Sequence, residues 1–164
     1  MSNQGMRVFR WFLPAWTAVV LSACAAAPTI DIQLTRLGPT GASFESHTGF
    51  AAPTNIVVRN HTEWEALWNT VYAGVTPRPI LPVVDFGTYL IVARAMGPRP
   101  TGGFHVMLDG LIRQSGEYLV HVREIHPGPG CGVTLAVTSP IDIARIARHD
   151  DPIRFAISTE VRRC

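Results

Sequence analysis

Beyond residue 88, glycine and proline divide the chain into short apolar segments. Because these residues interrupt regular secondary structure, each segment can form only a short element. The segments that have the length and composition of strands are residues 89–96, 103–111, 118–125, 133–138 and 153–158. Residues 141–147 fit a helix and a strand equally well, because their isoleucines recur at intervals of both two and three residues. The second half of the chain therefore predicts a sheet rather than a helical bundle.

One helix is clearly signalled, near residues 62–72. Thr62 and Glu65 have the spacing of a capping box, which satisfies free backbone N–H groups at a helix start. The apolar side chains that follow recur at helical spacing and predict a buried face: Trp64, Leu67, Trp68 and Val71. Residues 74–82 contain three prolines and predict a loop.

A single helix among many strands predicts an α+β domain, built as a mainly antiparallel sheet, an open barrel or a sandwich. A weaker alternation at Ile30, Ile32, Leu34 and Leu37 indicates a first strand, which Gly38-Pro39 ends. Residues 56–59 indicate another short strand.

Residues 103–111 and 118–125 predict a hairpin around the turn at 114–116. A two-residue turn pairs Gln114 with Glu117 and sets His105 opposite His126, with Glu124 near, where imidazoles could share a metal ion. A loop one residue longer aligns Leu108 with Val122 and separates the histidines. The apolar faces match imperfectly in the first register, so we expect no metal site.

The N-terminal stretch predicts export. Arg7 and Arg10 precede an apolar run over residues 11–21, and Leu21-Ser22-Ala23-Cys24 resembles the lipobox of bacterial lipoprotein signal peptides, which are cut before the cysteine. We expect a signal peptide at residues 1–23 and a lipid on Cys24. The alternatives are a retained membrane helix and ordinary secretory cleavage, and all three export the domain.

Loss of the leader makes the chain neutral. The 14 basic residues are all arginines, and removal of Arg7 and Arg10 leaves as many arginines as the 12 acidic residues. Phosphate backbones require a concentrated excess of basic side chains, and only Arg162-Arg163 is clustered, so we expect no nucleic-acid partner. The absence of lysine excludes Schiff-base chemistry and a P-loop.

Two cysteines remain once Cys24 is assigned to the lipid. Cys131 and Cys164 are an even pair in an exported chain, which predicts a disulfide, with two separate thiols as the alternative.

The sequence contains no nucleophile motif, zinc-protease motif or phosphate-binding glycine motif, so we expect neither enzymatic activity nor a cofactor. Asp85 and Asp109 are the candidate catalytic carboxylates, but both occur where the sequence predicts a turn, so we expect them to have structural roles.

Four landmarks, in order, resemble the PrcB C-terminal domain family. They are the helix at 62–68, Val84-Asp85-Phe86, the segment at 99–104, and Pro127–Cys131 followed by Thr138-Ser139-Pro140. The resemblance spans residues 56–158. It implies a non-catalytic domain, often on a lipoprotein, that in the founding system associates with a bacterial surface protease and supports its maturation. We therefore assign residues 24–50 to a lipidated tether with a possible first strand, and 51–164 to a PrcB C-terminal-like domain.

Two glycine- and proline-rich loops are the candidate partner- or ligand-binding surface. Rigid loops bind with little ordering cost, although these could also be mere connectors. Their residues are Arg99, Thr101, Gly102, Gly103 and Phe104, with Pro127, Gly128, Pro129 and Gly130.

The function expected from these features is a membrane-anchored binding or assembly domain whose protein partner is a protease. The alternative is a module that binds a small ligand or cell-wall glycan through the same loops. Because Ala25 replaces the aspartate that retains many lipoproteins in the inner membrane, we expect the outer membrane, facing the periplasm.

Overall fold

The computed structural model describes residues 31–32, 34–37, 48–114 and 116–164. The predicted signal peptide, the lipidation site Cys24, most of the predicted tether and the turn residue Ser115 lie outside the described residues. Within the described ranges, no helix is both long enough and apolar enough to span a bilayer.

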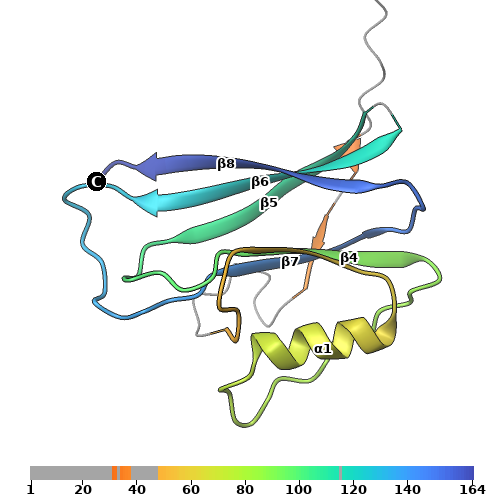
Figure 1. Ribbon diagram of the computed structural model, residues 1–164, viewed down its shortest axis with the longest axis horizontal. Helices are drawn as coiled ribbons and strands as arrows, with labels where there is room; N and C mark the ends of the chain where they lie inside the picture. The colour runs from red at the N-terminus through yellow and green to blue at the C-terminus, as the bar shows by residue number, and fades with distance from the viewer. Residues whose placement is uncertain (1–30, 33, 38–47, 115) are drawn as a thin grey trace, which may run out of the picture.

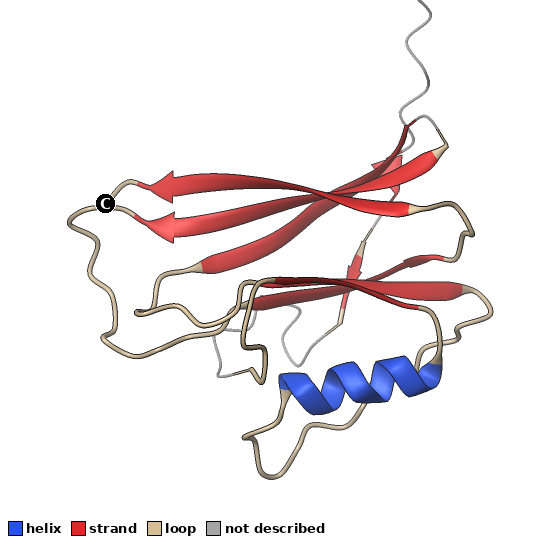
Figure 2. Cartoon of the chain, in the orientation of Figure 1, coloured by secondary structure: helices blue, strands red, loops and turns tan. Residues whose placement is uncertain are grey.

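The described strands form two four-stranded sheets, and one helix packs under the second (Figure 1, Figure 2). The outer sheet has the order β1 (Asp31–Ile32), β5 (His105–Gln114), β6 (Glu117–Pro127) and β8 (Ile153–Arg162). The central sheet has the order β2 (Thr35–Arg36), β7 (Ile141–Ala147), β4 (Tyr89–Ala95) and β3 (Thr54–Val58). All pairings are antiparallel except β6 with β8, which is parallel. The α+β class is confirmed, and the described strands do not close into a barrel.

β4 is buried on both faces, which makes the central sheet the middle of three layers. Leu90 and Val92 belong to the core between the two sheets, whereas Ile91 and Ala93 belong to the core under the helix. Side chains alternate between the faces of a strand, so a strand covered on both sides reads as a continuous apolar run. This explains why residues 89–96 are the strongest strand signal in the sequence.

The helix α1 (His61–Val71) covers the second face of the central sheet with its predicted apolar side chains, all of which are buried. The indole Nε1 groups of Trp64 and Trp68 donate hydrogen bonds to the carbonyls of Pro82 and Pro79, each at 2.9 Å. Buried indole N–H groups need such partners. The proline-rich segment is therefore a loop, as predicted, and it caps the two tryptophans.

The start of the helix differs from the prediction. The N-cap is Asn60, whose side chain accepts a hydrogen bond from the Glu63 N–H at 2.9 Å, and Glu63 in turn accepts one from the Arg59 N–H at 2.7 Å. Thr62 and Glu65 lie inside the helix, so the predicted capping box is wrong by two residues. Asparagine is a stronger N-cap than threonine, which accounts for the earlier start of the helix.

The hairpin combines features of both registers considered from the sequence. Gln114 pairs with Glu117, as a two-residue turn predicts, but Leu108 pairs with Val122, as the longer loop predicts. A β-bulge that adds Asp109 to β5 shifts the register by one residue between these pairs.

The bulge also separates the histidines. His105 pairs with Ile125, so the alignment of His105 with His126 is wrong. Adjacent positions on β6 point to opposite faces, and a metal site shared by the two imidazoles has no support in this register.

Of the two segments on either side of residue 140, residues 141–147 form a strand and residues 133–138 do not. Residues 141–147, which the sequence left open, form β7 and contribute to both cores. Residues 133–138 do not form the predicted strand; Thr138 alone makes a bridge, to Arg99 in another loop. Leu135 and Val137 are exposed, so two of the three large apolar residues that suggested a strand face solvent.

The predicted first strand is two short strands in different sheets. β1 pairs with β5 in the outer sheet, and β2 pairs with β7 in the central sheet. Ile30, Gly38 and Pro39 lie outside the described residues.

A buried carboxylate on β7 joins the central sheet to the bulge region of the outer sheet. Asp142 accepts a hydrogen bond from the Leu108 N–H at 2.8 Å and forms an ion pair with Arg36 Nε at 3.2 Å. Arg36 Nη2 donates to the Leu108 carbonyl at 2.9 Å. The Asp142–Arg36 pair thus provides hydrogen-bond partners for both the N–H and the carbonyl of Leu108. Without this pair, both backbone groups would lack a partner next to the bulge.

We predict that Asp142→Ala lowers the free energy of unfolding by about 3 kcal/mol, because it leaves the buried Leu108 N–H and the Arg36 guanidinium without their shared partner. Urea denaturation measures the change. Asp109→Ala is the matched control: its carboxylate lies on the same bulge but is partly exposed and paired with Arg123, so its loss should be much smaller. Equal losses for the two variants would contradict this account of the bulge.

Candidate functional site

The two predicted loops lie side by side at one end of the sandwich. The segments are residues 97–104, between β4 and β5, and residues 127–140, at the end of β6 and before β7; we call them the paired loops. Arg99 and Thr138 exchange two backbone hydrogen bonds, of 2.7 and 3.0 Å, so the loops are joined as two strands would be. Figure 1 shows both segments at the end of the molecule where the C-terminus lies.

Close packing of glycines holds the first loop against the second. The Gly102 N–H donates to the Thr134 carbonyl at 2.9 Å, and a Cβ on Gly102 would lie 2.3 Å from Thr134 Oγ1. Gly103 has a φ of 82°, a conformation that glycine adopts readily. The Thr138 hydroxyl donates to the Thr101 carbonyl at 2.9 Å. The sequence's Thr101-Gly102-Gly103 run is thus required by the approach of the other loop.

The second loop is fixed to the end of β8. The Gly128 N–H donates to the Arg162 carbonyl at 3.0 Å, and a Cβ on Gly128 would lie 2.2 Å from that oxygen. A disulfide joins Cys131 and Cys164, which fits the pairing expected for the two cysteines. The chain terminus and the loop are therefore linked by a hydrogen bond and a covalent bond within a few residues of each other.

A buried ion pair lies beneath the paired loops and ties the two sheets together. Arg94 on β4 donates from Nε and Nη2 to one carboxylate oxygen of Glu124 on β6, at 2.9 and 2.7 Å. Arg94 Nη1 also donates to the Asn55 side chain at 3.0 Å. The second Glu124 oxygen is 4.0 Å from Arg99 Nη2 and 3.8 Å from His126 Nε2. Sequence reasoning missed this pair, because its members lie in different sheets and 30 residues apart.

Phe104 is positioned by this cluster and does not extend from the loop. Its ring contacts the core between the sheets, lies edge-on to His126 with centroids 5.1 Å apart, and has the Arg99 guanidinium 5.7 Å above it. Two of the predicted site residues, Arg99 and Phe104, thus stack on each other at the base of the loop.

The exposed apolar residues of the paired loops are ones the sequence did not single out. Leu135 is 94% exposed and Val137 is 51% exposed, next to the two predicted segments. The second of the paired loops therefore presents two aliphatic side chains to solvent. Their alternation suggested a strand, but the structure places both in a loop, in which Thr138 alone forms a bridge.

The site offers positioned donors and apolar surface rather than a reactive group. Within the described residues, no group of three or more histidine, cysteine, aspartate or glutamate side chains could hold a metal ion. Asp85 accepts hydrogen bonds from the Thr88 hydroxyl and the Gly87 N–H, and these bonds lower its pKa. Asp109 pairs with Arg123 at 2.9 Å. Asp85 has the turn role predicted for it, whereas Asp109 lies at the β-bulge inside β5 and not in a turn at a strand end.

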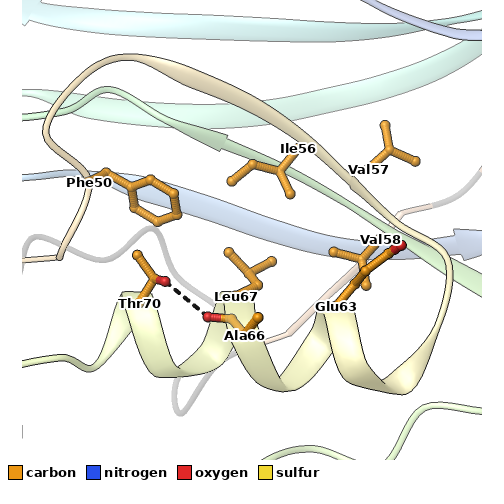
Figure 3. Close-up of a pocket in the computed structure, with 8 residues that line it drawn as sticks. All are labelled: Phe50, Ile56, Val57, Val58, Glu63, Ala66, Leu67 and Thr70. Carbon is orange, nitrogen blue, oxygen red and sulfur yellow. Dashed lines mark hydrogen bonds between the residues drawn. The ribbon is translucent and has the colours of Figure 1, made fainter.

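A groove lies between β3 and α1 (Figure 3). It has a volume of about 290 Å³ and is lined mainly by apolar side chains, including Phe50, Ile56 and Leu67. Its polar groups are already engaged, since the Thr70 hydroxyl donates to the Ala66 carbonyl and Glu63 caps the helix. This groove can accept an apolar side chain but brings no chemistry of its own.

Residues 90–147 match the sequence model of a family described as PrcB C-terminal. This range contains β5, β6, β7 and both paired loops, and all of β4 except its first residue. The helix and Val84–Phe86 landmarks lie outside it. No curated protein and no solved structure matches the chain. The segment that runs from β4 to β7 and includes both paired loops, residues 90–147, is therefore similar to the PrcB C-terminal family.

Proposed function

We propose that the chain is a lipid-anchored, non-enzymatic binding domain that holds an exported protease at the bacterial cell envelope through its paired loops. The family match supports a role related to a protease complex. The lipobox-like Leu21–Cys24 sequence supports the anchor, with the outer membrane as the expected location.

The observation that carries the binding proposal is the junction of the paired loops. Arg99 and Thr138 come from connections to different strands, yet they bond to each other through their backbones. The disulfide and the Gly128 bond fix the same surface to the C-terminal strand. A surface already ordered before binding loses little conformational entropy on association, which favours affinity.

The composition of the paired loops favours a protein partner over a glycan. Sugar rings commonly stack on exposed aromatic faces, and Phe104, the one aromatic residue of these fully described loops, packs against His126 and Arg99. Leu135 instead offers an exposed aliphatic side chain, which a protein partner can bury but which has no ring face for a sugar.

We predict that a photo-crosslinking amino acid at Leu135 captures the protease in cells that express the chain. Val83 is the matched control, because it is equally exposed, at 95% against 94%, but lies in the loop before β4 that follows the helix. Mass spectrometry identifies the adducts. Leu135→Asp should then reduce recovery of the captured protease at least about tenfold, because it places an unpaired charge in an apolar contact, and Val83→Asp should not.

The binding proposal fails if the Leu135 and Val83 probes capture the same proteins, or if a covalent glycan is the specific adduct at Leu135. It also fails if Leu135→Asp leaves recovery of the protease unchanged while the melting temperature shows a folded chain.

The anchor has a separate test. We predict that Cys24→Ala abolishes incorporation of a labelled fatty acid and moves the chain out of the lipoprotein fraction of the membranes, because lipid is attached to the cysteine thiol. Cys164→Ala is the control, since its thiol is in the disulfide and lipidation should persist. Labelling that survives Cys24→Ala would overturn the lipoprotein assignment without bearing on the paired loops.

A further inference from the structure

The outer edge of β8 has no partner strand among the described residues. β8 is ten residues long and ends the strand order of the outer sheet, where it pairs with β6 alone. An edge of this length presents a row of backbone N–H and C=O groups that can pair with another chain. Figure 1 shows it along the side of the molecule away from the helix.

The two faces of β8 differ in chemistry. Ile153 and Phe155 pack against the core between the sheets, so the odd-numbered positions lie on the inner face. Further along the same face, Ile157 is 43% exposed and Val161 is 59% exposed. The alternate face carries Arg154 and Glu160, both at exposed positions. The free edge is therefore flanked by apolar residues on one face and by opposite charges on the other.

These charges select one way of pairing β8 with itself. In an antiparallel pair of two copies centred on Ile157, Arg154 of each copy lies opposite Glu160 of the other. A shift of two residues in one direction sets Arg154 against Arg162, and a shift in the other direction leaves Glu160 without a basic partner on the facing strand. Opposite charges directly across two strands stabilise the pairing, and like charges oppose it.

We propose that two copies of the chain associate through antiparallel pairing of their β8 edges, with the two-fold axis at Ile157. The outer sheets of the copies then form one continuous eight-stranded sheet. Ile157 meets its own counterpart, and Val161 lies opposite Ile153 of the second copy, so the exposed apolar positions are covered.

The neighbouring side chains support the same arrangement. Within one copy, Glu160 pairs with Arg123 at 3.2 Å, and Arg154 pairs with Glu117 at 2.7 Å. The contact between copies joins these two pairs into a row of alternating charges. Antiparallel pairing also directs the C-terminal ends of the two β8 strands apart, which leaves both copies' paired loops accessible.

An introduced cysteine tests the register. Residues directly opposite each other in an antiparallel pair have Cα atoms about 4.5 to 5.5 Å apart, within reach of a disulfide. We expect Ile157→Cys in the chain expressed from its full-length sequence to give a covalent dimer on a non-reducing gel. Ser158→Cys is the control, because Ser158 faces Ala156 of the second copy and its own counterpart lies two positions away. Covalent dimerisation of the Ser158→Cys variant as efficient as that of the Ile157→Cys variant would overturn the register.

Charge reversal tests the association itself. We expect sedimentation equilibrium of the purified chain to show a dimer, and Arg154→Glu to raise its dissociation constant at least about tenfold by setting acid against acid at two places. Adding Glu160→Arg should restore dimerisation. A chain that stays monomeric at about 100 µM, well above micromolar affinities, or a dimer unaffected by Arg154→Glu, would overturn the proposal. Melting temperatures confirm that each variant is folded.

Discussion

Burial of β4 on both faces is the constraint on which the architecture depends. A strand covered on one side by a second sheet and on the other by a helix can contribute apolar side chains at every position, and residues 90–93 do so. Because β4 lies in the middle layer, α1 and the outer sheet are both packed against the same strand pair, β4 and β7. Removal of either layer would leave half of these side chains in water.

Polar groups settle how the layers are aligned. Apolar packing alone tolerates small shifts, but Asp142 must reach the Leu108 N–H, and Arg94 must reach Glu124. These two contacts join the central and outer sheets side by side, because Arg94 and Asp142 lie directly opposite each other on β4 and β7. The connections that leave the ends of β4 and β6 near Glu124 are therefore held close together, and the backbone bonds between Arg99 and Thr138 follow from that alignment.

Local sequence signals were sufficient to predict the elements that have a strong apolar periodicity or are bounded by glycine and proline. The apolar run of β4, the buried face of α1 and the turn that pairs Gln114 with Glu117 were all predictable. The bulge at Asp109 was not, because an extra residue in one strand is fixed by contacts from another sheet, here from Asp142. The strand expected at 133–138 failed for the same kind of reason: apolar alternation does not reveal whether a neighbouring strand exists. For the site, glycines and prolines identified the two loops, but neither their junction nor the exposed Leu135 could be deduced from spacing.

The central claim is that the paired loops form one ordered surface, and amide hydrogen exchange tests it directly. The N–H groups of Arg99, Gly102, Gly128 and Thr138 donate to backbone carbonyls across the loops or to β8. Their exchange should be slowed by several orders of magnitude and should approach that of β4 amides, whereas Leu135 at the exposed tip should exchange rapidly. Exchange of all four amides at the rate of an unstructured peptide, with β4 still protected, would contradict the claim.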